Sequence, residues 1–136
     1  MTIIAAVDES EKAGSVIEEA AYLASELGLD LHVIHIMNFE SIKSDPEELG
    51  ESTSIKEQAT AIAEELASKH ADEFHAIGLI GQPKEEIVSY AKKHNARYIV
   101  TSGRKRSPTG KAMFGSTSQY VILHADCPVL NVPEKK

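Results

Sequence analysis

The chain has 136 residues, 42% of them hydrophobic, which is enough to bury a core, so we expect a single domain over residues 1–136. No apolar run approaches the roughly 20 residues that a membrane-spanning helix needs. The first residues do not have the composition of a signal peptide. Cys127 is the only cysteine, which excludes an internal disulfide. These properties predict a cytoplasmic protein without membrane association.

The charge distribution favours a small anionic ligand over a nucleic acid. The formal net charge is -7, whereas a nucleic-acid-binding protein usually has a broad basic surface. Positive charge is nevertheless concentrated in one segment, residues 104–111, which contains Arg104, Lys105, Arg106 and Lys111 and no acid. Such a segment on an acidic protein suits a small anion better than a polymer.

Short apolar runs alternate with stretches of helical periodicity along the chain. The first run, residues 3–7, ends at Asp8 and is typical of a buried strand. Further strands are predicted at 31–37, 74–80, 98–100 and 129–132, and helices at 16–27, 54–66, 83–91 and 116–124. We expect Gly28 to end the first helix and Pro83 to begin the third. Residues 38–52 are predicted to be a polar connection.

This alternation predicts a doubly wound α/β fold, an open parallel sheet of five strands with helices on both faces. In such a sheet small ligands bind beyond the carboxyl ends of the strands, where the strand order reverses. If the order is 3-2-1-4-5, this place lies between the first and the fourth strand. Asp8, which follows the first strand, would then face the basic segment that follows the fourth.

The predicted start of the last helix resembles an anion site. Gly115, Ser116 and Thr117 stand where this helix begins, and free backbone N–H groups and the helix dipole attract anions to such a place. Gly115 has no Cβ, so a phosphate could approach the main chain, and the two hydroxyl groups could donate to it. The alternative is that Ser116 only caps the helix, which is a common role of serine.

The sequence shows no catalytic constellation and no metal site. No serine stands in a G-x-S-x-G elbow, and no spacing of cysteine and histidine suggests zinc. His32 and His35 lie three apart on a predicted strand, so they project to opposite faces, and we expect His35 to be a packed strand residue. We therefore predict neither catalytic residues nor metal ligands.

Several segments resemble the universal stress protein family, over nearly the whole chain. They are IIAAVDES, HIMN, GQPKEEIV, ARYIVTSGR and, as the most specific, GSTSQYVILHADCPVLNV. The resemblance implies a sheet of order 3-2-1-4-5, the fold class called adenine nucleotide alpha hydrolase-like. It also implies a homodimer formed through the last strand, which contains Val129 and Val132. In ATP-binding members the phosphates lie on a loop of pattern G-x2-G-x9-G-[ST].

Carried over to this sequence, the resemblance implies which residues bind the nucleotide. Val7 and Asp8 would lie on the ribose and adenine side, with the main chain of Ile36 beside the adenine. Gly115 and Ser116 match the final G-[ST], and together with Thr117 they would hold phosphates.

The two earlier glycines of the pattern are not both present. Counting nine residues back from Gly115 places Lys105 in the second glycine position and Ser102 in the first. Counting from Gly103 instead places Arg106 in the second position and leaves eight residues before Gly115. Either cation could fill the space of the phosphate or contact it.

The sequence thus predicts a stress-response homodimer that binds ATP, with or without Mg²⁺, and hydrolyses it slowly at most. The alternative is a dimeric interaction module of the same fold that has lost nucleotide affinity. A true ATPase ranks last, because no base that would position a water is apparent.

Overall fold

The computed structural model describes residues 1–38, 52–102, 104–106 and 112–133, with the side chains of 52–54, 104–106 and 112–114 left out. The strands are β1 (Thr2–Val7), β2 (Asp30–Met37), β3 (His75–Ile80), β4 (Ala96–Thr101), β5 (Arg104–Arg106), β6 (Ala112–Phe114) and β7 (Val129–Asn131). The helices are α1 (Ala13–Leu27), α2 (Ser52–His70), α3 (Pro83–Lys93) and α4 (Ser116–His124). None of the helices in these residues is long and apolar enough to span a membrane.

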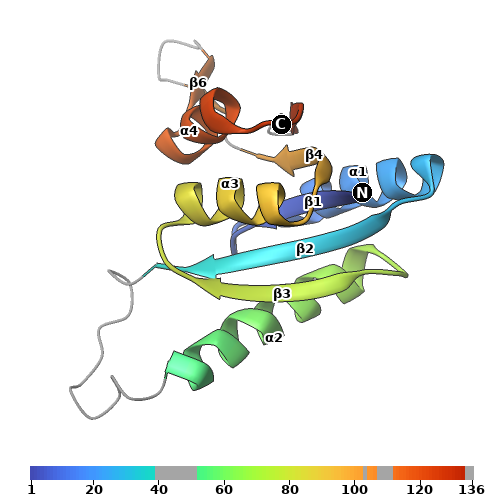
Figure 1. Cartoon of the computed structure of the whole chain (residues 1–136), viewed down its shortest axis with the longest axis vertical. Coiled ribbons are helices and arrows are strands. Elements are labelled where there is room, and N and C mark those ends of the chain that lie inside the picture. The colour runs from blue at the N-terminus through green and yellow to red at the C-terminus, as the bar shows by residue number, and fades with distance from the viewer. Residues whose placement is uncertain (39–51, 103, 107–111, 134–136) are drawn as a thin grey trace.

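Five strands form one parallel sheet in the order β3-β2-β1-β4-β7 (Figure 1). This is the predicted order 3-2-1-4-5, with β7 as the fifth strand. The order reverses between β1 and β4, because the chain first builds outward through β2 and β3 and then returns to the other side of β1. The predicted place for a ligand is therefore present at the carboxyl ends of these two strands.

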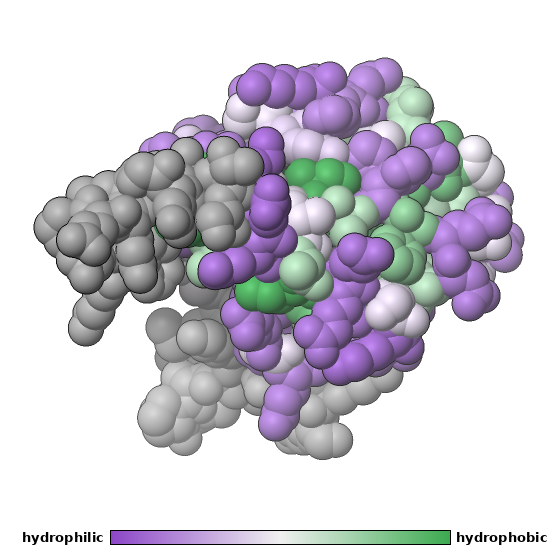
Figure 2. Space-filling model, turned by 90° about the horizontal axis from the view of Figure 1, so that it is seen from below, coloured by the Kyte–Doolittle hydropathy of each residue, from purple (hydrophilic) through white to green (hydrophobic). Residues whose placement is uncertain are grey.

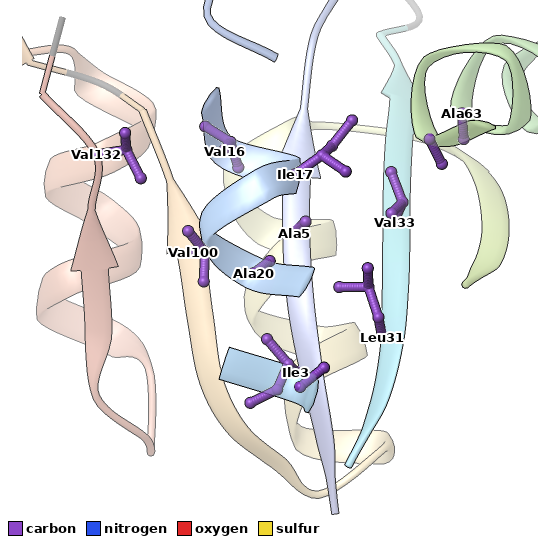
Figure 3. Close-up of a cluster of buried hydrophobic side chains, with 12 residues drawn as sticks. Ile3, Ala5, Val16, Ile17, Ala20, Leu31, Val33, Ala63, Val100 and Val132 are labelled. Carbon is purple, nitrogen blue, oxygen red and sulfur yellow. The ribbon is translucent and has the colours of Figure 1, made fainter. Parts of the chain in front are cut away.

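Side chains that alternate along each strand divide the core into two layers. On one face, Ile3, Val33 and Val100 pack with residues of α1 and α2, as Figure 3 shows for this cluster. On the other face, Ile4 and Ile99 pack with residues of α3 and α4. Both layers are apolar, so the strands appear in the sequence as nearly continuous hydrophobic runs. The described surface seen in Figure 2 is mostly hydrophilic, with small hydrophobic patches between the polar groups.

The helix ends largely follow the sequence. Gly28 has φ 66° and ψ 36°, the left-handed conformation that ends a helix, and its N–H donates toward the last turn of α1. Pro83 begins α3, and α4 has the predicted bounds. The predicted start of the second helix at residue 54 is wrong by two residues, because α2 already begins at Ser52.

The basic segment contains an element that the sequence did not predict. β5 and β6 pair as an antiparallel ribbon, in which Lys105 lies opposite Met113. This ribbon leads from the end of β4 to the start of α4. The predicted polar connection at 38–52 lies almost entirely outside the described residues.

Candidate functional site

Three adjoining hollows lie where β1 and β4 end and α4 begins. The first has a volume of about 200 Å³ and is lined by Ala6, Val7, Asp8, Ile34, Ile36, Pro83, Ile87, Thr101, Ser102, Thr117 and Ser118. Its walls come from the ends of β1, β2 and β4 and from the first turns of α3 and α4. Ile34, Ile36, Pro83 and Ile87 make one side apolar, which suits a flat, apolar group such as a nucleobase.

One polar group in the first hollow has no partner. Thr101 is only 5% exposed, and its Oγ1 has no hydrogen-bond partner among the described residues. The carbonyl of Thr101 is already paired, since it accepts from Val132 N–H at 2.7 Å. Buried hydroxyl groups are nearly always paired, so an unpaired one in a hollow marks a place where a ligand can supply the missing partner.

The second hollow is polar and has a volume of about 340 Å³. It is lined by Asp8, Ser10, Lys12, Ser102, Gly115, Ser116, Thr117 and Ser118. It shares Asp8, Ser102, Thr117 and Ser118 with the first hollow, so the two form one crevice with an apolar part and a polar part.

The start of α4 opens into this second hollow. Gly115 is the N-cap residue, with φ -69° and ψ 164°, and no side chain in the described part of the chain caps the helix there. Ser116 is the first helical residue, so the alternative in which Ser116 caps the helix is wrong. The first N–H groups of a helix have no partner within the helix, and here they face a hollow that can hold an anion.

The turn between β1 and α1 forms the opposite wall and is held by hydrogen bonds. Ser10 N–H donates to Asp8 Oδ1 at 2.9 Å, and Lys12 N–H donates to Ser10 Oγ at 3.3 Å. Ala13 N–H donates to the carbonyl of Ser10 at 3.2 Å. These bonds fix the exposed carboxylate of Asp8 at the junction of the two hollows, where it can accept from hydroxyl groups of a ligand.

A third hollow of about 480 Å³ continues the crevice past the turn. Its lining residues are Glu9, Ser10, Glu11, Lys12, Ser15, Ser102, Val132 and Pro133. It shares Ser10, Lys12 and Ser102 with the second hollow. The crevice is therefore longer than a nucleobase and a single phosphate require.

Most of the predicted binding residues line this crevice. Val7, Asp8, Ile36, Ser102, Gly115, Ser116 and Thr117 all do so. Gly103 lies outside the described residues. Lys105 and Arg106 belong to β5, whose side chains the structure does not describe, so their position relative to the crevice stays a prediction.

Sequence reasoning missed the apolar wall and the cation of the crevice. Pro83 and Ile87 could have been found, because α3 follows an edge strand on the same face of the sheet as Ile34. Lys12 belongs to no sequence motif, since only the hydrogen-bonded turn brings it to the hollow that Gly115 also lines.

The histidines on β2 lie on opposite faces, as predicted. His35 is buried, and its Nδ1 lies 3.0 Å from the carbonyl of Val7, which can only accept, so Nδ1 carries the proton. His32 contacts Tyr90 of α3 on the other face. Among the described residues no group of three or more histidine, cysteine, aspartate or glutamate side chains is placed to hold a metal ion.

Comparison with known proteins finds relatives of one family that match nearly the whole chain. Residues 1–133 match the sequence profile described as the Universal stress protein family. A universal stress protein of Thermus aquaticus is 33% identical over 138 residues, which cover 96% of this chain and 97% of that protein.

Solved structures of universal stress proteins are also similar to this chain. A universal stress protein from Archaeoglobus fulgidus, 32% identical, has a TM-score of 0.73 and covers 96% of this chain and 97% of its own. Another structure of a universal stress protein from that organism, in complex with dAMP, is 27% identical with a TM-score of 0.67 and covers 96% of both chains. The sheet order, the crevice and these matches lead to one conclusion. The chain belongs to the universal stress protein family.

Proposed function

We propose that the chain binds an adenine nucleotide, ATP, in the first two hollows of the crevice. The observation that carries this proposal is that the open start of α4 at Gly115 and the carboxylate of Asp8 line the same polar hollow. Phosphate is favoured at a helix start, and ribose hydroxyl groups donate to a carboxylate. The adjoining apolar hollow is the remaining space for the base.

Each part of the nucleotide then has a place. The base lies against Ile36 and the end of β1 at Val7, and a base edge is the partner for the unpaired hydroxyl of Thr101. Asp8 accepts from the ribose. Ser116 and Thr117 donate to the phosphates, together with the first N–H groups of α4. The dAMP complex of the Archaeoglobus fulgidus relative supports an adenine nucleotide as the class of ligand.

The nucleotide acts mainly as a ligand. Asp8 is the only acid among the described residues that line the first two hollows, and one of its oxygens already accepts from Ser10 N–H. No second acid or histidine is available there to activate a water, so hydrolysis is slow at most.

The functional unit in this proposal is a homodimer. β7 is an edge strand of the sheet, and Leu130 at its centre is 38% exposed. An apolar edge strand pairs readily with another strand, and a second copy of β7 offers the same surface.

Titration calorimetry on purified, nucleotide-free protein tests the proposal. We expect heat on addition of Mg-ATP and a higher melting temperature with ligand, because a ligand that binds only the folded state stabilises it. Asp8→Asn and Thr101→Val should each weaken binding, whereas Glu65→Gln on the exposed surface of α2 should not. Absence of heat at high micromolar nucleotide, with an unchanged melting temperature, would refute the proposal.

A second candidate function is an interaction module of the same fold without nucleotide affinity. The observation that favours it is that Lys105, in the position of a phosphate-loop glycine, is part of the β5–β6 ribbon. Replacement of Lys105 by glycine separates the two functions. If Lys105→Gly binds ATP and the wild-type protein does not, the chain is an interaction module that has lost nucleotide affinity. If the wild-type protein binds ATP and Lys105→Gly binds it more weakly, Lys105 contacts the phosphates.

A further inference from the structure

Lys12 is the one cation in the described lining of the crevice. It lines both the second and the third hollow, whereas no lysine or arginine is present among the described residues around the first. Lys12 lines the second hollow together with Gly115 and Ser116 at the open start of α4. A ligand that lies along the crevice therefore passes both the start of α4 and Lys12.

The backbone of Lys12 is fixed, while its ammonium group has no ion-pair partner among the described residues. Its N–H donates to Ser10 Oγ at 3.3 Å, and its carbonyl accepts from Val16 N–H at 3.2 Å. The ion pairs within 4.0 Å in the described part of the chain join Lys69 to Glu65 and His70 to Glu18, so none of them involves Lys12. The side chain is half-buried, which limits the directions in which its charge can point.

The other charged side chains in the described lining of the crevice are acidic. Asp8 lines the second hollow, Glu9 and Glu11 line the third, and the whole chain has a net charge of -7. The start of α4 offers N–H groups and a partial positive charge to one phosphate, but this partial charge cannot compensate several phosphates. Additional phosphates would lie near these acids, and Lys12 is the cation in the described lining that can compensate their charge.

We propose that Lys12 binds the outer phosphates of the nucleotide and makes the crevice select ATP over AMP. The inference rests on the proposed nucleotide site and assigns within it the residue that distinguishes a triphosphate from a monophosphate. The first phosphate lies at the start of α4, and the outer phosphates run toward the boundary between the second and third hollows. Ser10 and Lys12 line both of these hollows, so the outer phosphates meet the ammonium group there.

The test compares affinities for AMP, ADP and ATP in the full-length, nucleotide-free protein by calorimetry. The variants are Lys12→Met, Lys12→Gln and Lys12→Arg, and the matched control is Lys69→Met, which removes a lysine from an exposed ion pair on α2. We expect Lys12→Met and Lys12→Gln to lower the affinity for ATP about tenfold, the size of one charge-assisted hydrogen bond. Their affinity for AMP should stay within about twofold, and Lys12→Arg should retain most of the ATP preference.

The possible results separate the two proposals. If the wild-type protein binds AMP and ATP but Lys12→Met and Lys12→Gln leave the ratio of the two affinities unchanged, the role of Lys12 is overturned and the nucleotide site stands. An equal loss for AMP and ATP also overturns it, because a general disturbance of the turn would act on both. If the wild-type protein binds none of the three nucleotides, the proposed function fails and this inference with it.

Discussion

The Nδ1 atom of His32 on β2 lies 2.6 Å from the hydroxyl oxygen of Tyr90 on α3. Two more imidazole rings lie close by, since the ring centres of His75 and His94 are 5.0 Å and 5.6 Å from that of His32. Burial lowers the pKa of His32, and His75 and His94 lower it further, while Asp30 opposes them. The end of the sheet opposite the crevice is thus joined to α3 by a cluster of histidine and tyrosine rings.

This cluster makes the stability of the fold depend on pH. The unfolded chain takes up a proton at His32 near the ordinary pKa of 6.5, whereas the folded protein resists it until a lower pH. The free energy of unfolding should therefore fall as the pH decreases below about 6.5 and level off below the pKa of the folded state. Thermal melts between pH 8 and pH 5 measure this effect. His32→Asn should flatten the profile relative to the wild type and to His124→Asn, and an unchanged slope would contradict the assignment.

The hydroxyl group of Tyr90 should contribute measurably to stability. Tyr90→Phe leaves the half-buried Nδ1 of His32 without its partner, so we expect a loss of about 1 kcal/mol in the free energy of unfolding. Tyr22→Phe is the matched control, because Tyr22 is 61% exposed and should lose almost nothing. Chemical denaturation of both variants measures the difference, and equal stability of the two would show that the short contact does not stabilise the protein.

Gly78 on β3 should not tolerate even a methyl group. A Cβ at this position would overlap the backbone N of Thr60 on α2, and backbone cannot move aside as a side chain can. We expect Gly78→Ala to shift α2 away from the sheet and to cost several times the effect of Gly28→Ala. A Cβ at Gly28 would meet no atom of another segment within 4 Å, and only the left-handed backbone opposes alanine, by about 1–2 kcal/mol. Urea denaturation of the two variants measures these costs, and similar values would contradict the close approach of α2.

A charge on the edge strand β7 should separate the proposed dimer. Leu130→Asp places a carboxylate at the exposed centre of the strand, so two copies would repel each other and desolvate a charge on pairing. Leu27→Asp is the matched control, since Leu27 is 48% exposed at the end of α1. Sedimentation velocity at micromolar concentration should show dimers of the wild type and of Leu27→Asp, and monomers of Leu130→Asp. A wild-type protein that sediments only as a monomer would refute dimerisation through β7.

The fold could be predicted because both faces of the sheet are covered. Strands that are buried on two sides must be continuously apolar, and the helices between them must show one apolar stripe, so the alternation is visible in the sequence. Asp8 and Gly115 could be placed near each other from the strand order, because this order brings the ends of β1 and β4 side by side.

The features that the sequence did not predict depend on contacts between distant segments. The β5–β6 ribbon consists of two strands of three residues each, which carry too few residues for a periodic signal. Whether Ser116 or Gly115 caps α4 depends on a shift of one residue, which sequence patterns do not resolve. The histidine cluster arises from the register that pairs His32 with His75 and from the docking of α3 over it, so three scattered residues gave no motif.

The contact between α2 and β3 also limits how the protein can assemble. The N–H of Gly78 on this edge strand donates to Thr60 Oγ1 at 3.0 Å, and Thr60 in turn donates to the carbonyl of Lys56. A backbone donor that would otherwise invite a neighbouring chain is thereby satisfied within the subunit. If two copies associate through β7 as proposed, this satisfied donor on β3 gives a further copy one point of attachment fewer at the other border of the sheet.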